Sequence, residues 1–259
     1  RAALWALGPQ GRIPPLPMPQ AKIKSMRGAK MRKAPSNDPI VLVMGFGPHA
    51  GAEENPADAA VKALHGFRVA GARVQAVILP SAYGPAARRL KASLRRLDPC
   101  AVVCFAAGSP GPFLLERTAR NRDDDARPDA GRKVHRALPI DRKGPAEVPS
   151  TLPLDVIRAR LAAADIPSVD SDNAGAYLGN HDFYQLMRAM PADRGVAGLI
   201  RMPVPSTKAD MAAKARLRLQ AATAVRLIVG AAAERGVMFR AAAQALALDG
   251  GGGGVGAAP

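Results

Sequence analysis

PIVLVMGFGP, residues 39–48, is a short apolar run that ends in two glycines and a proline. Such a run with a turn-forming end is typical of a strand buried on both faces, followed by its loop. Next, Asn55 and Pro56 supply a helix N-cap and a first-turn proline, and apolar residues continue as far as Gly66. This part of the chain therefore predicts a strand, a loop and a helix.

The same alternation recurs along the chain. We expect strands at 73–79, 101–105, 113–119, 166–169 and 196–202, and helices at 85–97, 154–164, 180–190 and 208–235. Strands that alternate with helices favour an α/β fold, with a parallel or mixed sheet covered on both faces. Ligands collect at the carboxyl ends of the strands in such a sheet, so the loops there are the first candidates for a site.

The composition indicates one domain flanked by tails. The chain has 259 residues, of which 48% are apolar, and this suffices for one well-buried core. We divide it into a basic, proline-containing arm at 1–38, expected to be disordered, a domain at 39–240 and an Ala/Gly-rich tail at 241–259. The sequence has no run of about 18 apolar residues that could span a membrane.

The cysteines and the charge bear on location and partners. Cys100 and Cys104 are the two cysteines, and their spacing in a strand does not suit a disulfide, so we expect a reducing, cytoplasmic location. The net charge is +16, and half of that excess lies in residues 1–33, before the first acidic residue. The helix at 85–97 carries five further basic residues: Arg88, Arg89, Lys91, Arg95 and Arg96. Because no aromatic residues are interleaved with them for base stacking, we do not expect nucleic-acid binding.

Four segments, in this order, are unusual in combination. They are Gly45–Gly51 with Asn55-Pro56, Leu79-Pro80 with Tyr83-Gly84, Glu116–Asp129, and Ser171–His181. Together they resemble pyroglutamyl peptidase I, the pyrrolidone-carboxylate peptidase family, whose corresponding motifs include G-F-x-P-F-G-G, N-x-D-D-A-R-x-P-D and S-N-T-A-G-T-Y-V-C-N-H. The resemblance extends from about Ile40 to about Arg235.

This resemblance implies a fold and an activity. The fold is a three-layer αβα sandwich with a mixed, mostly parallel sheet, of the phosphorylase/hydrolase-like kind. The family reaction is the thiol-dependent removal of N-terminal pyroglutamate by a cysteine, with a histidine that carries the proton and a glutamate that orients it. The resemblance implies no cofactor and no metal, and it suggests a homo-oligomer, either a dimer or a tetramer.

The catalytic positions depart from the family pattern. Glu116 matches the glutamate, but Gly179 stands at the cysteine position and Arg201 at the histidine position. Glycine has no nucleophile, and arginine is a permanent cation that cannot act as a base near neutral pH. We therefore expect a Glu116–Arg201 ion pair and little or no peptidase activity by the ordinary route, and the sequence leaves open whether the chain is an enzyme.

The substrate pocket implied by the resemblance is also altered. Phe46 is retained, whereas His49 replaces the second phenylalanine of the apolar pocket. The loop at 106–110 lacks the family's glutamine. The binding of N-terminal pyroglutamyl peptides is thus in question as well as their cleavage.

Two other sets of residues could carry chemistry. Cys104 near a strand end and His181 just after Gly179 could form a relocated catalytic pair, although a buried cysteine is usually a small hydrophobe and His181 suits a capping or packing role. The aspartates Asp123, Asp124, Asp125 and Asp129 could be taken for a metal cluster. Because no His or Cys lies among them and arginines flank them, we expect a solvated loop there.

Three functions remain compatible with the sequence. The first is an inactive relative of the peptidase that acts by binding or assembly. The second is an active hydrolase with a relocated nucleophile. The third is a basic protein that binds nucleic acid or an acidic partner.

Overall fold

The computed structural model describes residues 38–47, 56–206 and 211–249. The predicted arm, apart from Asp38, therefore lies outside the described residues, as do His49 and the N-cap at Asn55. The Asp38 carboxylate forms an ion pair with Arg68, 2.7 Å away.

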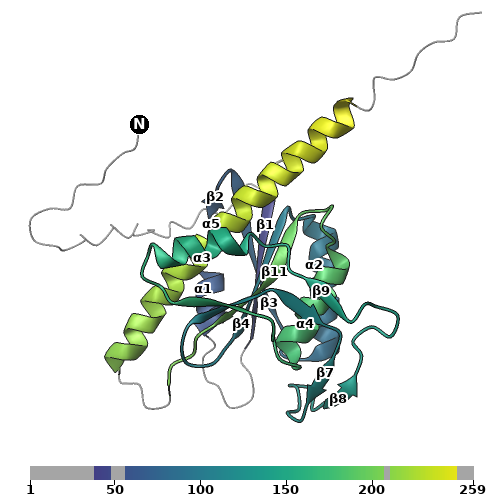
Figure 1. Ribbon diagram of the computed structural model, residues 1–259, viewed down its shortest axis with the longest axis vertical. Coiled ribbons are helices and arrows are strands. Elements are labelled where there is room, and N and C mark those ends of the chain that lie inside the picture. Colours follow the sequence, from purple (N-terminus) through teal and green to yellow (C-terminus); the bar gives the residue numbers. More distant parts are fainter. Residues whose placement is uncertain (1–37, 48–55, 207–210, 250–259) are drawn as a thin grey trace, which may run out of the picture. The chain divides into compact units, whose positions relative to one another are not determined.

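Within the described residues, the central sheet has seven strands in the order β10-β5-β11-β4-β1-β3-β2 (Figure 1). They are β1 (Ile40–Phe46), β2 (Arg68–Val69), β3 (Ala72–Leu79), β4 (Ala101–Ala107), β5 (Phe113–Glu116), β10 (Ser168–Ser171) and β11 (Val196–Met202). Neighbouring strands run parallel except at β11–β5 and β2–β3, which are antiparallel. The sheet is therefore mixed and mostly parallel, as predicted.

Helices cover both faces of the sheet (Figure 1). On one face lie α1 (Pro56–Lys62), α3 (Leu154–Ala162) and α5 (Met211–Asp249), and on the other lie α2 (Tyr83–Leu97) and α4 (Leu178–Ala189). In β1, Val41 and Val43 pack towards the first group, whereas Leu42 and Met44 pack towards the second. Successive side chains of a strand point to opposite faces, so one short apolar run contributes to both cores. The three-layer αβα architecture is confirmed.

Most predicted elements are present, with shifted ends. The strand at 196–202 matches β11, but the predicted strand at 113–119 breaks at Arg117, because β6 (Thr118–Arg120) leaves the sheet to pair with β9 (Glu147–Pro149). The first helix ends at Lys62 rather than near Gly66, which has φ +83 in a turn.

The last helix is longer than predicted. Helix α5 continues beyond Arg235 to Asp249 and so includes the first nine residues of the stretch 241–259 that was predicted to be a tail. Alanine, the strongest helix former, supplies many of these positions. Among the described helices, none combines the length and the apolar character that a membrane span requires.

A small hairpin was missed by the sequence analysis. Strands β7 (Asp123–Asp125) and β8 (His135–Leu138) pair antiparallel, outside the main sheet and next to α4 (Figure 1). Their residues are mostly polar, and β8 is largely exposed, so the hairpin has no apolar pattern to reveal it.

Candidate functional site

A cavity of about 240 Å³ lies where the carboxyl ends of the strands meet the start of α4. Its walls include Phe46 from the end of β1, Ala106 from β4, Arg201 from β11, and Tyr177 and Gly179 at the start of α4. The cavity therefore lies at the carboxyl edge of the sheet, where the sequence predicts a site.

Gly179 is the second residue of α4 and lines the cavity. A Cβ atom at this position would lie 3.5 Å from the Cβ of Ala106, an ordinary van der Waals contact, so the backbone would accept a larger residue here. The start of α4 is held in place by the next residue, Asn180, whose side chain is fully buried. Its Oδ1 accepts a hydrogen bond from the backbone N–H of Arg120 at 2.9 Å, and its Nδ2 donates to the carbonyl of Arg120 at 2.8 Å.

Arg201 and Glu116 form the predicted ion pair. The Nε of Arg201 lies 2.5 Å from Oε1 of Glu116, and its Nη2 donates a 2.6 Å hydrogen bond to the carbonyl of Asn173. The carboxylate of Glu116 is fully buried, whereas the side chain of Arg201 remains 21% exposed and reaches the cavity. Strands β11 and β5 are far apart in the sequence but are neighbours in the sheet, where they run antiparallel. This pairing brings the two side chains together.

The other predicted pocket residues are only partly described. Phe46 is 7% exposed and lines the cavity, and the carbonyl of the next residue, Gly47, accepts a 3.0 Å hydrogen bond from the Ser81 hydroxyl. His49 lies outside the described residues. At the end of β4, the backbone N–H of Gly108 donates a 2.7 Å hydrogen bond to the carbonyl of Met202, which holds this loop against β11.

Cys104 does not lie at a strand end. Strand β4 continues to Ala107, and Cys104 is paired in register with Met44 on one side and Leu199 on the other. Its side chain is 1% exposed, and burial raises the pKa of its thiol. A buried thiol with a raised pKa is a poor nucleophile, and Cys104 is not among the residues that line the cavity.

The prediction of a solvated aspartate loop is half wrong. Asp124 and Asp125 do face counter-charges, from Arg122 and Arg127. Asp123 and Asp129, however, are only 2% and 4% exposed. The prediction failed because the sequence does not reveal that Asp123 lies in a strand that pairs with β8 and contacts His181 of α4.

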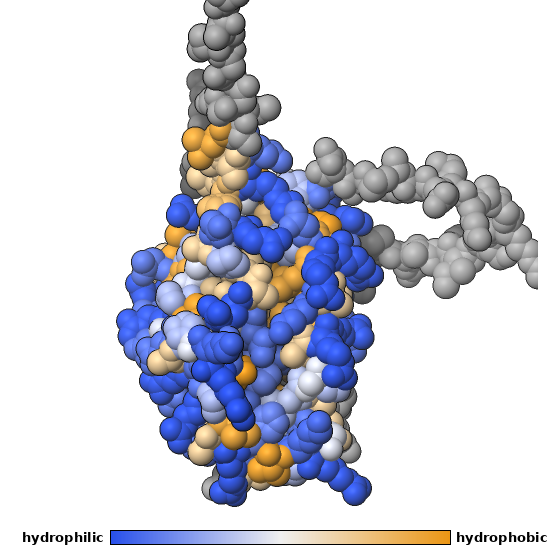
Figure 2. All heavy atoms as spheres, turned by 90° about the vertical axis from the view of Figure 1, so that its right-hand side faces the viewer, coloured by the Kyte–Doolittle hydropathy of each residue, from blue (hydrophilic) through white to orange (hydrophobic). Residues whose placement is uncertain are grey.

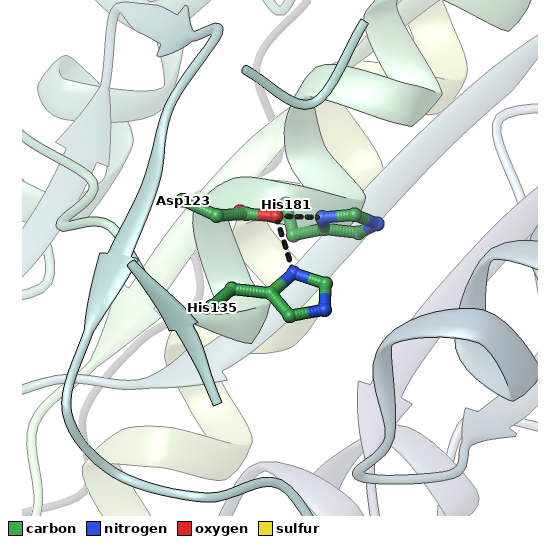
Figure 3. A group of neighbouring side chains, drawn as sticks. All are labelled: Asp123, His135 and His181. Carbon is green, nitrogen blue, oxygen red and sulfur yellow. Dashed lines mark hydrogen bonds and ion pairs between the residues drawn. The ribbon is translucent and has the colours of Figure 1, made fainter. Parts of the chain in front are cut away.

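Asp123 is instead the centre of a cluster with two histidines (Figure 3). Its Oδ2 lies 2.9 Å from Nδ1 of His135, on β8, and 2.8 Å from Nδ1 of His181, on α4. The ring of Tyr83 stacks on His135, with 3.9 Å between the ring centroids, and meets His181 edge-on. His181 is thus buried against Tyr83 and Asp123, whereas His135 was missed because it lies 12 residues from Asp123 without any motif.

The surface of the domain on the side of α2 and α4 is mainly hydrophilic, with scattered apolar patches (Figure 2). The five basic side chains of α2 are exposed there. They are spread along a solvated helix face, as expected for an Arg-rich surface.

Comparisons with known proteins support the resemblance that the sequence motifs indicate. The model of the family described as Pyroglutamyl peptidase matches residues 40–235. The chain is 36% identical over 182 residues to the pyrrolidone-carboxylate peptidase of Gloeobacter violaceus, in a match that covers 69% of this chain and 89% of that protein. It is 39% identical over 190 residues to the pyrrolidone-carboxylate peptidase of Cupriavidus pinatubonensis, covering 70% and 86%.

Solved structures agree. The structure of a mutant pyrrolidone carboxyl peptidase from the hyperthermophile Pyrococcus furiosus superposes with a TM-score of 0.68 at 27% identity, covering 75% of this chain and 98% of that one. The fold of the Bacillus amyloliquefaciens pyroglutamyl peptidase I superposes with a TM-score of 0.71 at 24% identity, covering 77% and 98%.

Proposed function

Because this chain belongs to the pyroglutamyl peptidase family, we propose that it keeps the fold and the cavity of that family but has lost the thiol-dependent removal of N-terminal pyroglutamate. The observation that carries the proposal is Gly179. It lines the cavity at the start of α4, within the segment from Ala174 to His181 whose family pattern places a cysteine there. A thiol peptidase without its thiol cannot form the acyl-enzyme on which the family reaction depends.

The Glu116–Arg201 pair supports the same conclusion. In the family reaction, a glutamate orients a histidine that takes a proton from the cysteine and returns it to the leaving group. Here the Nε of Arg201 lies 2.5 Å from Oε1 of Glu116, so the guanidinium is paired with the carboxylate that would orient a histidine. Arginine stays protonated in proteins, so it cannot accept that proton. Losing either group costs orders of magnitude in rate, and the two losses are not additive because the groups act together.

The cavity itself is suited to binding. It has room for a small ring, and Phe46 supplies an apolar wall. We infer that any pyroglutamyl ligand binds here without being cleaved. We also propose that the protein acts in the cytoplasm. As a separate proposal, it self-associates as a dimer or a tetramer. The alternative with Cys104 as nucleophile is disfavoured by the burial of that residue.

Turnover of a chromogenic pyroglutamyl amide tests the proposal. We expect the purified protein to release no chromophore above a protein-free blank, with or without iodoacetamide. Robust turnover that iodoacetamide abolishes would overturn the proposal, because it would require an active thiol.

A reconstructed site tests the alignment behind it. The double substitution Gly179→Cys, Arg201→His supplies both missing groups, and the 3.5 Å contact with Ala106 leaves space for the new side chain. We expect it to gain iodoacetamide-sensitive turnover. The matched control, Gly179→Ala with Arg201→His, makes the same backbone change without a thiol and should remain inactive.

A further inference from the structure

We propose that Asp123, His135 and His181 bind one divalent transition-metal ion of the zinc class. The three side chains come from β7, β8 and α4 and point towards one another (Figure 3). One candidate ligand atom from each lies within 4.8 Å of the other two. This site is separate from the residues that stand at the peptidase positions, and it does not depend on the proposed loss of that activity.

The arrangement of the donor atoms suits such an ion. Nδ1 of His135 and Nδ1 of His181 approach the same carboxylate oxygen, at 2.9 and 2.8 Å. In zinc sites, imidazole nitrogen lies about 2.0–2.1 Å and carboxylate oxygen about 2.0–2.2 Å from the ion, so tetrahedral ligands are roughly 3.3 Å apart. The two gaps therefore need to widen by only about 0.5 Å on this geometry.

The ligands can adjust by this amount. His135 lies on a two-stranded hairpin, and its side chain is 25% exposed, so its ring can shift outwards. Tyr83 stacks on that ring and limits its rotation. A metal ion binds the lone pair of an imidazole nitrogen, so coordination through Nδ1 leaves the ring proton on Nε2.

A second observation comes from buried oxygen atoms beside the cluster. Among the described residues, Oδ1 of Asp123 has no hydrogen-bond partner, and neither do the two carboxyl oxygens of Asp182 or the hydroxyl of Tyr83. Asp123 is 2% exposed and Asp182 is fully buried. Buried carboxyl groups are costly unless a charge or a hydrogen bond compensates for them. A divalent cation bound to Asp123 would supply such a charge.

The donor set also selects the kind of ion. Two imidazoles and one carboxylate favour zinc, cobalt, nickel or copper over calcium and magnesium, which prefer oxygen ligands. Three protein ligands leave a coordination position open for water or another small ligand. The aspartates alone gave no reason to expect a metal from the sequence, and only the fold brings the histidines to Asp123.

Metal titration of the full chain tests the proposal. The protein, free of any affinity tag, is treated with a chelator, dialysed, and titrated with Zn²⁺ alone by calorimetry. We expect one ion per chain, and we expect Co²⁺ to give visible absorption bands of a low-coordinate nitrogen and oxygen site. Excess Mg²⁺ should not compete.

The decisive variant is His135→Asn, because His135 is partly exposed and its loss leaves the core intact. We expect it to weaken Zn²⁺ binding at least about tenfold and to abolish the Zn²⁺-dependent rise in Tm. His65→Asn is the matched control. His65 is exposed on the face of the sheet opposite to α4, where its Nδ1 accepts a hydrogen bond from the backbone N–H of Ala76. This substitution should leave the Zn²⁺ affinity and the Zn²⁺-dependent rise in Tm unchanged. The proposal is overturned if Zn²⁺ does not bind the wild-type chain, or if it binds with equal affinity to the His135→Asn variant.

Discussion

Among the described residues, Arg201 is the charged partner of the fully buried carboxylate of Glu116. Arg201→Met keeps much of the side-chain volume and removes the charge. Breaking a buried ion pair by removing one partner typically costs about 3–5 kcal/mol, because the other charge is left uncompensated. Since Arg201 retains 21% exposure, water can enter, and we expect the lower end of that range, about 3 kcal/mol.

Urea unfolding at pH 7 measures this loss. With a slope of about 2 kcal/mol per molar urea, a loss of about 3 kcal/mol moves the midpoint down by roughly 1.5 M. Glu116→Gln in the Arg201→Met background removes the buried charge, so the double variant should lose less stability than the sum of the two single variants, with a coupling of about 2 kcal/mol.

The matched control is Arg117→Met. Arg117 also pairs with a carboxylate, that of Asp172, but both side chains are about half exposed, so water already solvates the two charges and we expect a much smaller loss than at Arg201. If Arg201→Met costs no more than Arg117→Met, or if the losses at Arg201 and Glu116 simply add, the buried pair does not govern stability and the reasoning is refuted.

Other contacts give three further predictions. Gly236→Ala in α5 should destabilise the domain by about 1–3 kcal/mol, because its Cβ would lie 2.5 Å from the carbonyl oxygen of Cys100; Gly230→Ala in the same helix meets only an ordinary contact at 3.5 Å and should gain up to about 1 kcal/mol. Equal urea midpoints for these two variants would contradict the packing described. Burial works to raise the pKa of Asp129, but hydrogen bonds from the backbone N–H groups of Lys133 and Tyr83 outweigh it and the pKa is lowered. Its contribution to stability is therefore present above the unfolded pKa and is lost as pH falls through the folded pKa, so Asp129→Asn should cost more stability near neutral pH than in acid; a cost that is independent of pH would rule out this linkage. Burial raises the pKa of both Cys100 and Cys104, so both thiols should react slowly with a thiol reagent at mildly alkaline pH and rapidly in denaturant, and fast labelling of the native protein would show that one of them is accessible.

Several features of the fold were accessible from the sequence because they depend on local periodicity. The apolar runs in β1, β4 and β11 are buried on both faces, and such strands are visible without tertiary information. The ends of α1 and α5 were misplaced, because helix ends depend on capping and packing that periodicity does not encode. The strand predicted at 113–119 was split by a change of partner, which no local pattern records.

The candidate site shows the same division. The order of the four motifs placed Glu116, Gly179 and Arg201, and the charges of the first and last of these predicted their ion pair. The motifs could not place Asp123 in a buried cluster, because its two partners come from a polar hairpin and a helix 12 and 58 residues away.

By itself, the sequence determined the family and the alternation of strands and helices, and it led to the prediction that Gly179 and Arg201 replace the family's cysteine and histidine, because each of these depends on residue identity and order. The tertiary structure alone decided which charges are buried, that the side chain of Cys104 is buried in the core, and that Asp123 contacts two histidines. Burial and proximity arise when distant segments pack together, and they set the pKa values and partners on which the chemistry of these residues depends.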